Sequence, residues 1–287
     1  MRRSKVLYVP FWATYVFLYL PIVVLVVMSF NSGRSAYTYE GFSLKWYGEL
    51  AADERIRTGV VNTLIVAAGS TVIATVLGTL LAVGLLRYTR SKALDALAMM
   101  PAVLPDLVLA IGLMLVYGLI DMTLGLHSVM LSHALFSMAF VAAVVRTRLA
   151  GADSSLEEAS RDLGAGPVVT FLKITLPQLT PGIIAGALLA FTLSVDEFVI
   201  AFFTIGNAEP TLPIVIYSMI RFGVTPKINA LAAILLLVSF TAVIAGQRLT
   251  KIGERGPNRT PGAPRAEIKV QGEADSTNGT EKSRAQD

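Results

Sequence analysis

The stretch LEEASRDLGAGPVVTFLKITLP, residues 156–177, is a polar and charged island between apolar segments long enough to cross a bilayer. Ser155 followed three residues later by Glu158 matches a capping box, which predicts that a short helix begins there. Gly164 comes just after the last periodic residue, where a glycine can take the left-handed conformation that ends a helix. The island is therefore predicted to begin with a capped helix that Gly164 stops.

A second short helix is expected after the glycine. Pro167 suits the first position of a helix, and Pro177 is expected to stop the helix that Pro167 opens. Leu156, Ala159 and Leu163 recur at helical spacing on one face of the first helix. The sequence thus predicts a helix, a tight turn and a second helix, with a small apolar face that can sit closely against a partner.

Six positions of this stretch match the pattern E-A-A-x3-G-x9-I-x-L-P, with Ser160 in place of the second alanine. The pattern resembles the cytoplasmic loop of the membrane subunits of binding-protein-dependent ABC importers. In that family the loop is the coupling helix, which docks into a groove on the ATPase subunit. The resemblance implies a coupling loop over residues 146–181 and assigns ATPase coupling to Glu158, Ala159, Ser160, Leu163, Gly164, Ile174, Leu176 and Pro177.

The composition is that of an integral membrane protein. Hydrophobic residues make up 54% of the chain and charged residues 15%, and the mean hydropathy is +0.64, too apolar for a soluble domain of this size. There is no cysteine, and His127 and His133 are the two histidines, so no metal site is expected. The basic residues are spread over loops and tail and form no stripe, so nucleic acid is not an expected partner.

Six apolar segments are predicted to span the membrane as helices: 6–30, 59–86, 93–120, 128–145, 182–204 and 229–247. The second is rich in Ala, Gly, Thr and Ser and is expected to lie inside the bundle, while the third is expected to bend at its prolines. The segment 205–228 is too interrupted to span and contains an amphipathic middle. Residues 1–249 form the predicted transmembrane domain, and residues 250–287 a disordered tail.

The distribution of positive charge predicts the orientation. When both termini are placed in the cytoplasm, 18 of the 24 Lys and Arg residues lie on that side and 6 lie outside. Such an excess of Lys and Arg is typical of cytoplasmic loops. The chain is therefore expected to be a multi-pass protein of the bacterial inner membrane, with the island at residues 156–177 facing the cytoplasm.

Acidic residues within the predicted spans are candidates for a substrate path. A carboxylate at membrane depth costs about 2.5 kcal/mol or more, so Asp106, Asp196 and Glu197 are functional-site candidates. Asp196 and Glu197 are adjacent and would point about 100° apart on a continuous helix. Asp106 could instead satisfy backbone groups freed by a kink at Pro105. Aromatic faces for an ammonium group could come from three further residues: Tyr217, Tyr117 and Phe222.

Further stretches narrow the resemblance. They are SFNSGR at 29–34, KWY at 45–47, Pro105 with Asp106, FTLSVDEFVIAFF at 191–203 and IYSMIRFGVTPKINALA at 216–232. Together they look like the C-type permeases of spermidine and putrescine ABC importers, over almost the whole chain before the tail. Glu197 stands where that family is expected to have an aspartate.

This resemblance implies the type I ABC importer permease fold and a polyamine-carrying channel subunit. The implied partners are a homologous permease, two ATPase subunits that bind ATP and Mg, and an extracytoplasmic substrate-binding protein. No residue of this chain is assigned a catalytic role or a cofactor, and the sequence contains no G-x-x-x-x-G-K-S/T loop. The alternatives are a permease for another small solute and an ion-coupled secondary transporter, and the latter leaves the coupling loop unexplained.

Overall fold

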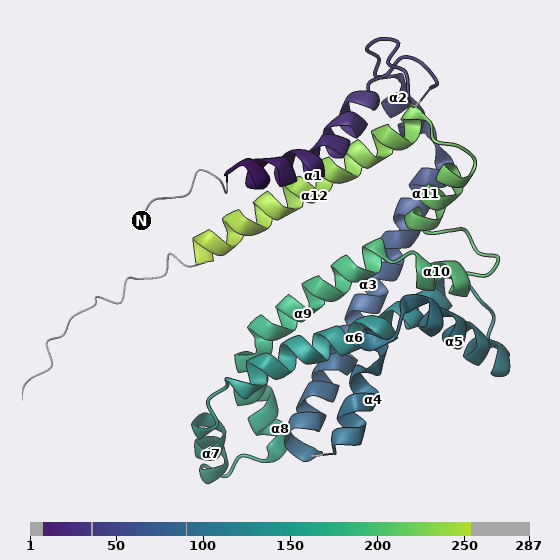
Figure 1. Cartoon of the computed structure of the whole chain (residues 1–287). Coiled ribbons are helices and arrows are strands. Elements are labelled where there is room, and N and C mark those ends of the chain that lie inside the picture. Colours follow the sequence, from purple (N-terminus) through teal and green to yellow (C-terminus); the bar gives the residue numbers. More distant parts are fainter. Residues whose placement is uncertain (1–7, 36, 90, 254–287) are drawn as a thin grey trace, which may run out of the picture. The chain divides into compact units, whose positions relative to one another are not determined.

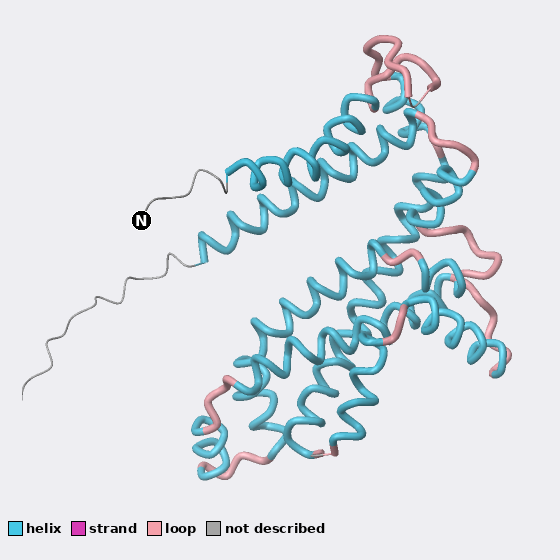
Figure 2. The backbone as a smooth tube through the Cα atoms, viewed as in Figure 1, coloured by secondary structure: helices cyan, strands magenta, loops and turns pink. Residues whose placement is uncertain are grey.

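The computed structural model describes residues 8–35, 37–89 and 91–253. The chain divides into two compact units, Met1–Leu236 and Leu237–Asp287. The regular structure of the described residues is helical (Figure 2), and their one β-bridge joins Asn31 to Phe42. The prediction of an all-α chain is therefore confirmed for the part described. The predicted tail lies outside it from residue 254 onward.

Most of the helices belong to the first unit. In chain order, this unit contains α1 (Tyr8–Met28), α2 (Lys45–Ala52), α3 (Glu54–Val83), α4 (Lys92–Val103), α5 (Asp106–Leu119), α6 (Leu126–Ala150), α7 (Ser155–Asp162), α8 (Pro167–Thr170), α9 (Leu176–Asp196), α10 (Val199–Thr204) and α11 (Leu212–Arg221). The helix α12 (Pro226–Gly253) begins in the first unit and ends in the second. Two π-helical segments, η2 (Gly84–Tyr88) and η3 (Phe171–Thr175), continue α3 and precede α9.

Most of the predicted spans have a helical counterpart of sufficient length. Among the described residues, four helices are long and apolar enough to cross a membrane: Tyr8–Met28, Glu54–Tyr88, Leu126–Ala150 and Pro167–Asp196. The pair α4 and α5 passes the same test as one span, bent by 106°. The apolar part of α12, Pro226–Thr241, is shorter. The structure thus supports a multi-pass protein with up to five such spans, and the sixth span stays a prediction.

The centre of the first unit is a bundle of α3, α6 and α9, which run side by side (Figure 1). Small residues allow this close packing. A Cβ atom added at Gly78 of α3 would lie 2.8 Å from the carbonyl oxygen of Met138, and one at Gly186 of α9 would lie 3.2 Å from Val141 Cγ1. The prediction that the second span lies inside the bundle is therefore confirmed.

The amphipathic middle predicted within residues 205–228 forms α11. This helix packs against α3, and its Leu212 and Val215 are buried with Trp46 and Ile56 in one hydrophobic cluster. The connection before α11 is also held by α3, because Asn62 Nδ2 donates to the Glu209 carbonyl oxygen at 2.9 Å. One end of α3 is thereby tied to the chain that leads into α11.

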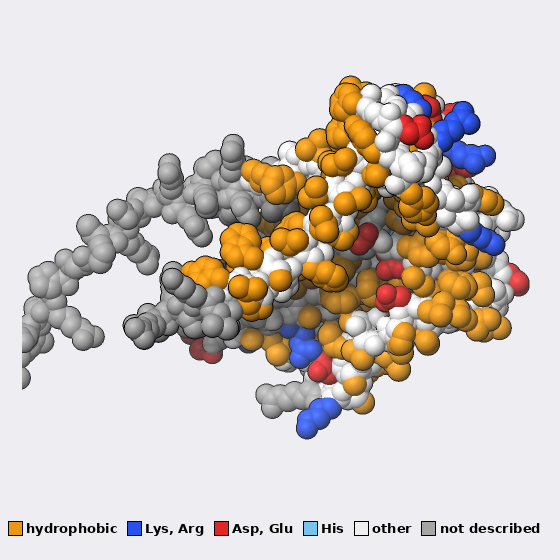
Figure 3. Space-filling model, turned by 45° about the horizontal axis from the view of Figure 1, so that its top comes forward, with side chains coloured by type: hydrophobic (Ala, Val, Ile, Leu, Met, Phe, Trp, Pro, Cys, Tyr) orange, Lys and Arg blue, Asp and Glu red, His pale blue; other side chains and the backbone are white. Residues whose placement is uncertain are grey.

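The outer surface of the first unit is largely apolar. α1 buries none of its residues in the described structure, and hydrophobic side chains cover much of the face shown in Figure 3. Long helices with exposed apolar side chains are expected of a protein whose solvent is lipid.

Candidate functional site

The first candidate site is the segment formed by α7, α8 and η3, where the sequence predicts a coupling loop. α7 begins at Ser155, as predicted, but the predicted capping box is wrong. Ser154 occupies the N-cap without a side-chain bond, and the Ser155 N–H donates to Asp153 Oδ1 at 2.9 Å. A charged carboxylate two residues upstream satisfies the free N–H, so the Glu158 side chain is left available.

The end of α7 is a Schellman turn centred on Gly164. Gly164 has φ +84°, its N–H donates to the Arg161 carbonyl at 2.9 Å, and the Ala165 N–H donates to the Ser160 carbonyl at 3.1 Å. These two bonds define the Schellman motif. The predicted glycine stop is therefore confirmed. Ser160, the one departure from the family pattern, also reaches across the turn, since its Oγ lies 3.1 Å from Thr170 Oγ1.

The second helix begins at Pro167 as predicted, but the prediction that Pro177 stops it is wrong. α8 passes into η3, and η3 passes into α9 without a break, so that residues Pro167–Asp196 form one helix. The Leu176 N–H donates to the carbonyl of Phe171, five residues back. Pro177 is the second residue of α9 and directly follows this π turn inside the continuous helix. Ile174, Leu176 and Pro177 therefore lie at the start of the long helix.

The apolar side chains of α7 face outward. Leu156 is 49% exposed and Leu163 is 89% exposed, and Ala159 and Glu158 are exposed beside them. Val168, just beyond the turn, is 67% exposed. An apolar face that the chain leaves uncovered in a polar segment is typical of a protein–protein contact.

The opposite side of α7 holds Glu157, for which the sequence pattern predicts no role. Its carboxylate forms a two-point ion pair with the Arg87 guanidinium and accepts a hydrogen bond from Thr175 Oγ1 at 2.7 Å. Burial raises the pKa of Glu157, but the bonds from Arg87 and Thr175 outweigh burial, so the pKa is lowered. The adjacency of Glu157 and Glu158 is the sequence signal for a second role. Neighbouring residues of a helix point about 100° apart, so the two carboxylates cannot both face the same partner surface.

The second candidate site lies where two spans are broken. The predicted bend of the third span is confirmed, and it falls at Leu104 and Pro105, between α4 and α5. Asp106 is the first residue of α5, and its side chain is exposed. Within residues 8–35, 37–89 and 91–253 the Asp106 carboxylate accepts no hydrogen bond, so backbone groups freed at the bend do not occupy it.

The fifth span is also interrupted, so the prediction of a continuous helix over residues 182–204 is wrong. α9 ends at Asp196, Glu197 is extended with φ −72° and ψ 113°, and α10 starts at Val199. Glu197 Oε1 accepts the Ile200 N–H at 2.9 Å and so satisfies the first turn of α10. The 100° separation expected for Asp196 and Glu197 on one helix therefore does not apply.

The two breaks share one hydrophobic cluster. α5 packs against α10, and Leu109 and Ile200 are buried in a cluster to which Leu104 and Val199 also contribute. Leu104 precedes the break that leads to Asp106, and Val199 follows the break at Glu197. Three carboxylates, those of Asp106, Asp196 and Glu197, are thus carried by a pair of packed, discontinuous spans.

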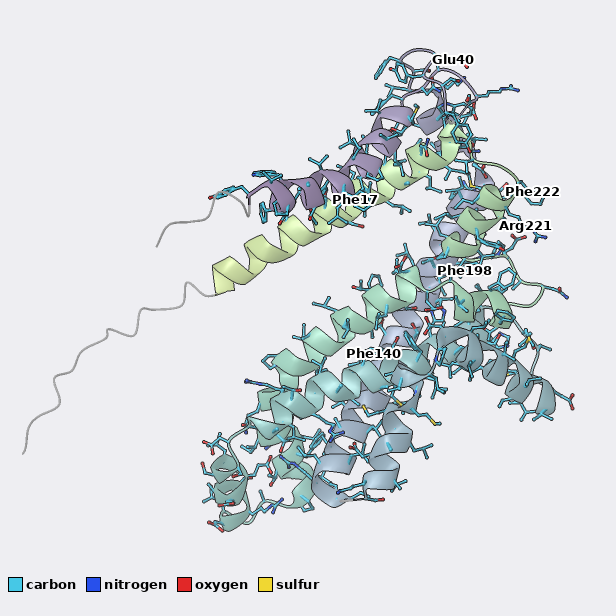
Figure 4. The ribbon with its side chains drawn as sticks, viewed as in Figure 1. Phe17, Glu40, Phe140, Phe198, Arg221 and Phe222 are labelled. Carbon is cyan, nitrogen blue, oxygen red and sulfur yellow. The ribbon has the colours of Figure 1, made fainter. Side chains whose placement is uncertain are left out.

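Aromatic rings flank the second break. Phe198 lies where α9 gives way to α10 (Figure 4). Its ring centroid is 4.8 Å from that of Tyr217, and the Tyr217 ring is 5.8 Å from that of Phe202. The structure therefore brings Tyr217 beside the residue that follows Glu197. Phe198 and Phe202 were not named as candidates, because the sequence does not show that α11 packs near α10.

The other two aromatic candidates lie apart from this group. Tyr117 is buried, and its hydroxyl lies 2.8 Å from Ser132 Oγ. Tyr117 therefore contributes to packing between α5 and α6. Phe222 stands at the end of α11 (Figure 4) and is 89% exposed.

A buried polar junction joins the three helices of the central bundle. His133 Nδ1 of α6 lies 2.8 Å from Ser194 Oγ of α9, and Ser70 Oγ of α3 donates to the same Ser194 oxygen at 3.0 Å. These contacts give His133 a role in helix packing. Among the described residues no group of three or more His, Asp or Glu side chains could hold a metal ion.

Comparisons with known proteins agree with this geometry. Residues 74–255 match the family model described as the binding-protein-dependent transport system inner membrane component. The spermidine/putrescine transport system permease protein PotC of Escherichia coli strain K12 is 39% identical over 246 residues, which cover 85% of this chain and 93% of that protein. The putrescine permease PotI of the same strain is 41% identical over 231 residues, covering 77% and 82%.

Solved structures share the fold at low sequence identity. A bacterial ABC transporter involved in the import of the acidic polysaccharide alginate contains a chain with TM-score 0.62 and 17% identity, covering 88% of this chain and 98% of that chain. A chain of the MetNI methionine ABC transporter in inward-facing conformations gives TM-score 0.57 and 20% identity, covering 69% and 95%. Because importers of an acidic polysaccharide and of an amino acid share this fold, the fold alone does not specify the solute.

Proposed function

Because the chain belongs to the binding-protein-dependent transport system inner membrane component family, we propose that it is a channel subunit of an ATP-driven importer of spermidine, putrescine or both. It works beside a homologous permease and two ATPase subunits, and it receives polyamine from an extracytoplasmic binding protein. All six spans are embedded in the bacterial inner membrane, with both termini and α7 on the cytoplasmic side.

The observation that carries this proposal is the outward-facing apolar surface of α7. Leu156 and Leu163 are exposed in a helix whose other side is anchored through Glu157. A firmly held helix with an uncovered apolar face suits docking into a groove of an ATPase. The exposed Glu158 adds a negative charge at the same surface. An ion-coupled secondary transporter has no use for such a surface.

The chemistry at the broken spans supports a polycationic substrate. A polyamine carries several ammonium groups, and an unpaired charge at membrane depth is strongly disfavoured. Asp106, Asp196 and Glu197 offer negative charge where backbone helices are discontinuous, which is where transporters place substrate sites. The ring of Tyr217, 42% exposed, offers a face for a cation. These residues form the proposed path, and 39% identity to a spermidine/putrescine permease supports the same substrate class.

In the proposed cycle, closure of the ATPases on ATP moves α7 and opens the path outward. Polyamine released by the binding protein then passes the carboxylates when the path reopens inward. The chain itself binds and orients the amine and performs no bond chemistry.

The test uses the assembled complex purified in detergent with loaded binding protein. Putrescine or spermidine is expected to stimulate ATP hydrolysis, whereas amino acids and acidic sugars are not. Asp106→Asn and Asp196→Asn keep side-chain size and remove charge, so both should lower polyamine uptake while the complex still assembles. Glu49 is an exposed carboxylate on α2. Glu49→Gln is therefore the matched control and should leave uptake unchanged.

Uptake at the wild-type level in the Asp106→Asn/Asp196→Asn double variant, in a well-assembled complex, would show that the acidic path is wrong. Stimulation of ATP hydrolysis by a different solute alone would then assign another substrate to the same importer.

A further inference from the structure

Both π-helical segments of the described chain converge on one side chain of α7. Arg87 belongs to η2, which ends the long helix α3, and Thr175 belongs to η3, which precedes α9. The Glu157 carboxylate binds both of them. π-Helical turns are rare and occur frequently at functional sites. Here each π turn contributes one residue whose side chain contacts Glu157.

Glu157 is fully engaged in these contacts. Arg87 Nη1 donates to Oε2 at 2.6 Å, Arg87 Nη2 donates to Oε1, and Thr175 Oγ1 donates to Oε1 at 2.7 Å. The Glu157 side chain is 10% exposed and that of Arg87 is 26% exposed. A two-point guanidinium–carboxylate pair fixes orientation as well as distance, and burial protects it from screening by salt.

The ion pair joins α7 to η2 beside a groove. α7 packs against α8 and η3, and a groove of about 450 Å³ is lined by residues of α3 and η2 on one side and by residues of α8 and η3 together with Arg161 of α7 on the other. Its apolar lining includes Leu80, Val83, Phe171 and Leu172. Arg87 also lines this groove and reaches Glu157, so the side-chain pair joins α7 to α3.

The far end of α3 is tied down in the same manner. Thr63 Oγ1 accepts the Leu212 N–H at 2.8 Å, and Asn62 Nδ2 donates to the Glu209 carbonyl at 2.9 Å. The continuous helix Glu54–Tyr88, made of α3 and η2, therefore carries Arg87 near one end and holds the entry of α11 through Asn62 and Thr63. A displacement of α7 can be passed along α3 as well as along α9, to which α7 is joined through α8 and η3.

We propose that Glu157 is a positioning residue that makes α7 and the adjoining ends of α3 and α9 move as one body. This inference rests on the proposed function, because it assigns to α7 the displacement that an ATPase supplies. Glu158 and the apolar face of α7 meet the partner, and Glu157 passes the displacement into the bundle. Breaking the ion pair between Glu157 and Arg87 should leave docking of the ATPases and ATP hydrolysis in place but reduce the amount of polyamine transported per ATP.

The first test measures the link directly in the isolated chain. The sequence contains no cysteine, so cysteines introduced for Asp162 on α7 and Leu86 on η2, both exposed, are the only sites for spin labels. Double electron–electron resonance should give a narrow distance distribution in the otherwise wild-type chain and a broader one in Glu157→Ala and Arg87→Ala. The double variant should be no broader than either single variant, because both remove the same pair.

The second test measures coupling in the complete complex. Glu157→Ala should retain the ATPase subunits and their hydrolysis but move about fivefold less polyamine per ATP, the lower end of typical coupling between sites. Asp95→Asn is the matched control, because Asp95 pairs with Arg146 between α4 and α6 and does not touch α7. That control should keep the wild-type ratio of transport to ATP hydrolysis.

Two results would overturn the inference: an unchanged distance distribution in both single variants, or a wild-type transport ratio in Glu157→Ala. If Glu157→Ala accumulates poorly, Arg87→Lys serves instead, since lysine keeps the charge but cannot make two parallel bonds. Failure of the proposed function is recognised separately, by a wild-type chain that retains no ATPase subunits.

Discussion

At the scale of single residues, Gly164 fixes the angle between α7 and α8 by its backbone conformation. Its φ is +84°, and an added Cβ atom would meet nothing within 4 Å. Gly164→Val should therefore destabilise the turn by strain alone, by about 1–2 kcal/mol. The expected result is faster hydrogen exchange over α7 and α8 and weaker retention of the ATPases, with membrane insertion intact.

The control for Gly164→Val is two residues away. Gly166 has φ −69° and is likewise open around its Cβ position. Gly166→Ala should leave both exchange and ATPase retention unchanged. If Gly164→Val matches Gly166→Ala in both measurements, the left-handed turn does not position α7.

Glu158 supplies a second prediction at the residue scale, because it is exposed beside the apolar face of α7. Glu158→Lys reverses its charge without breaking a contact within the described chain. The variant should fold and insert normally but retain less ATPase in a pull-down. The same reversal at the exposed Glu49 of α2 should retain it fully, and equal retention in the two variants would remove Glu158 from the docking surface.

Asp53 gives the start of α12 a dependence on pH. Lys227 Nζ donates to Asp53 Oδ2 at 2.6 Å, and the Arg55 N–H donates to Oδ1 at 3.0 Å. The hydrogen bond from Lys227 is the main cause that lowers the pKa of Asp53, and the opposing effect of burial is smaller. A lowered folded pKa means that the stabilisation is present above the unfolded pKa of about 3.9 and is lost as pH falls through the folded value.

Hydrogen exchange at residues 226–236 should therefore accelerate as the pH is lowered below about 4, beyond the intrinsic pH effect on exchange. Asp53→Asn should show weak protection at every pH and lack this acid step. Glu54→Gln removes a neighbouring, exposed ion pair with Arg57 and should keep the step. An acid step that persists in Asp53→Asn would assign it to another group.

At the scale of helices, the crossing of α3 and α6 depends on the absence of a side chain. A Cβ atom at Gly78 would lie 2.8 Å from both the Met138 carbonyl oxygen and Val141 Cβ. Gly78→Ala should force the helices apart at a cost of about 1–3 kcal/mol and lower the yield of folded protein in a thermal-stability assay. Gly112→Ala, where an added Cβ meets nothing within 4 Å, should cost nothing, and equal losses in the two variants would contradict this account.

The positions of helices are predicted well from sequence, but their breaks are not. The lengths of apolar runs and the excess of small residues predicted where spans lie and that the second is central. Run length does not predict the break at Glu197, because that break depends on a side chain capping α10. Nor does the sequence predict that the helix continues through Pro177, because that continuation depends on the π turn directly before it.

The candidate site shows the same division. The Gly164 turn was predictable because it depends on local backbone chemistry. The Glu157 pair with Arg87 was not, since the two residues are 70 positions apart and meet only when α7 folds back on η2. The contact between Phe198 and Tyr217 likewise depends on the packing of distant segments, so the sequence does not predict Phe198 as part of the site.

At the scale of the whole molecule, the excess of Lys and Arg predicts which side each loop faces. Cysteines introduced at Ser35 and at the exposed Asn207 should react with a membrane-impermeant maleimide added to intact cells, and one at Ser154 should react only after the membrane is opened. Because the chain has no native cysteine, the unsubstituted chain has no thiol to label. Labelling of residue 154 in sealed cells would contradict the proposed orientation.

The central claim is that this chain conducts polyamine in a process driven by partner ATPases. The most direct measurement is uptake of radiolabelled spermidine and putrescine into proteoliposomes that contain the chain, its permease partner and both ATPases. We expect uptake to require ATP on the side of the membrane that α7 faces and loaded binding protein on the opposite side. We also expect uptake to persist when ion gradients are dissipated. Uptake that is driven by an ion gradient without ATP, or ATP-driven uptake that excludes both amines, would contradict the account.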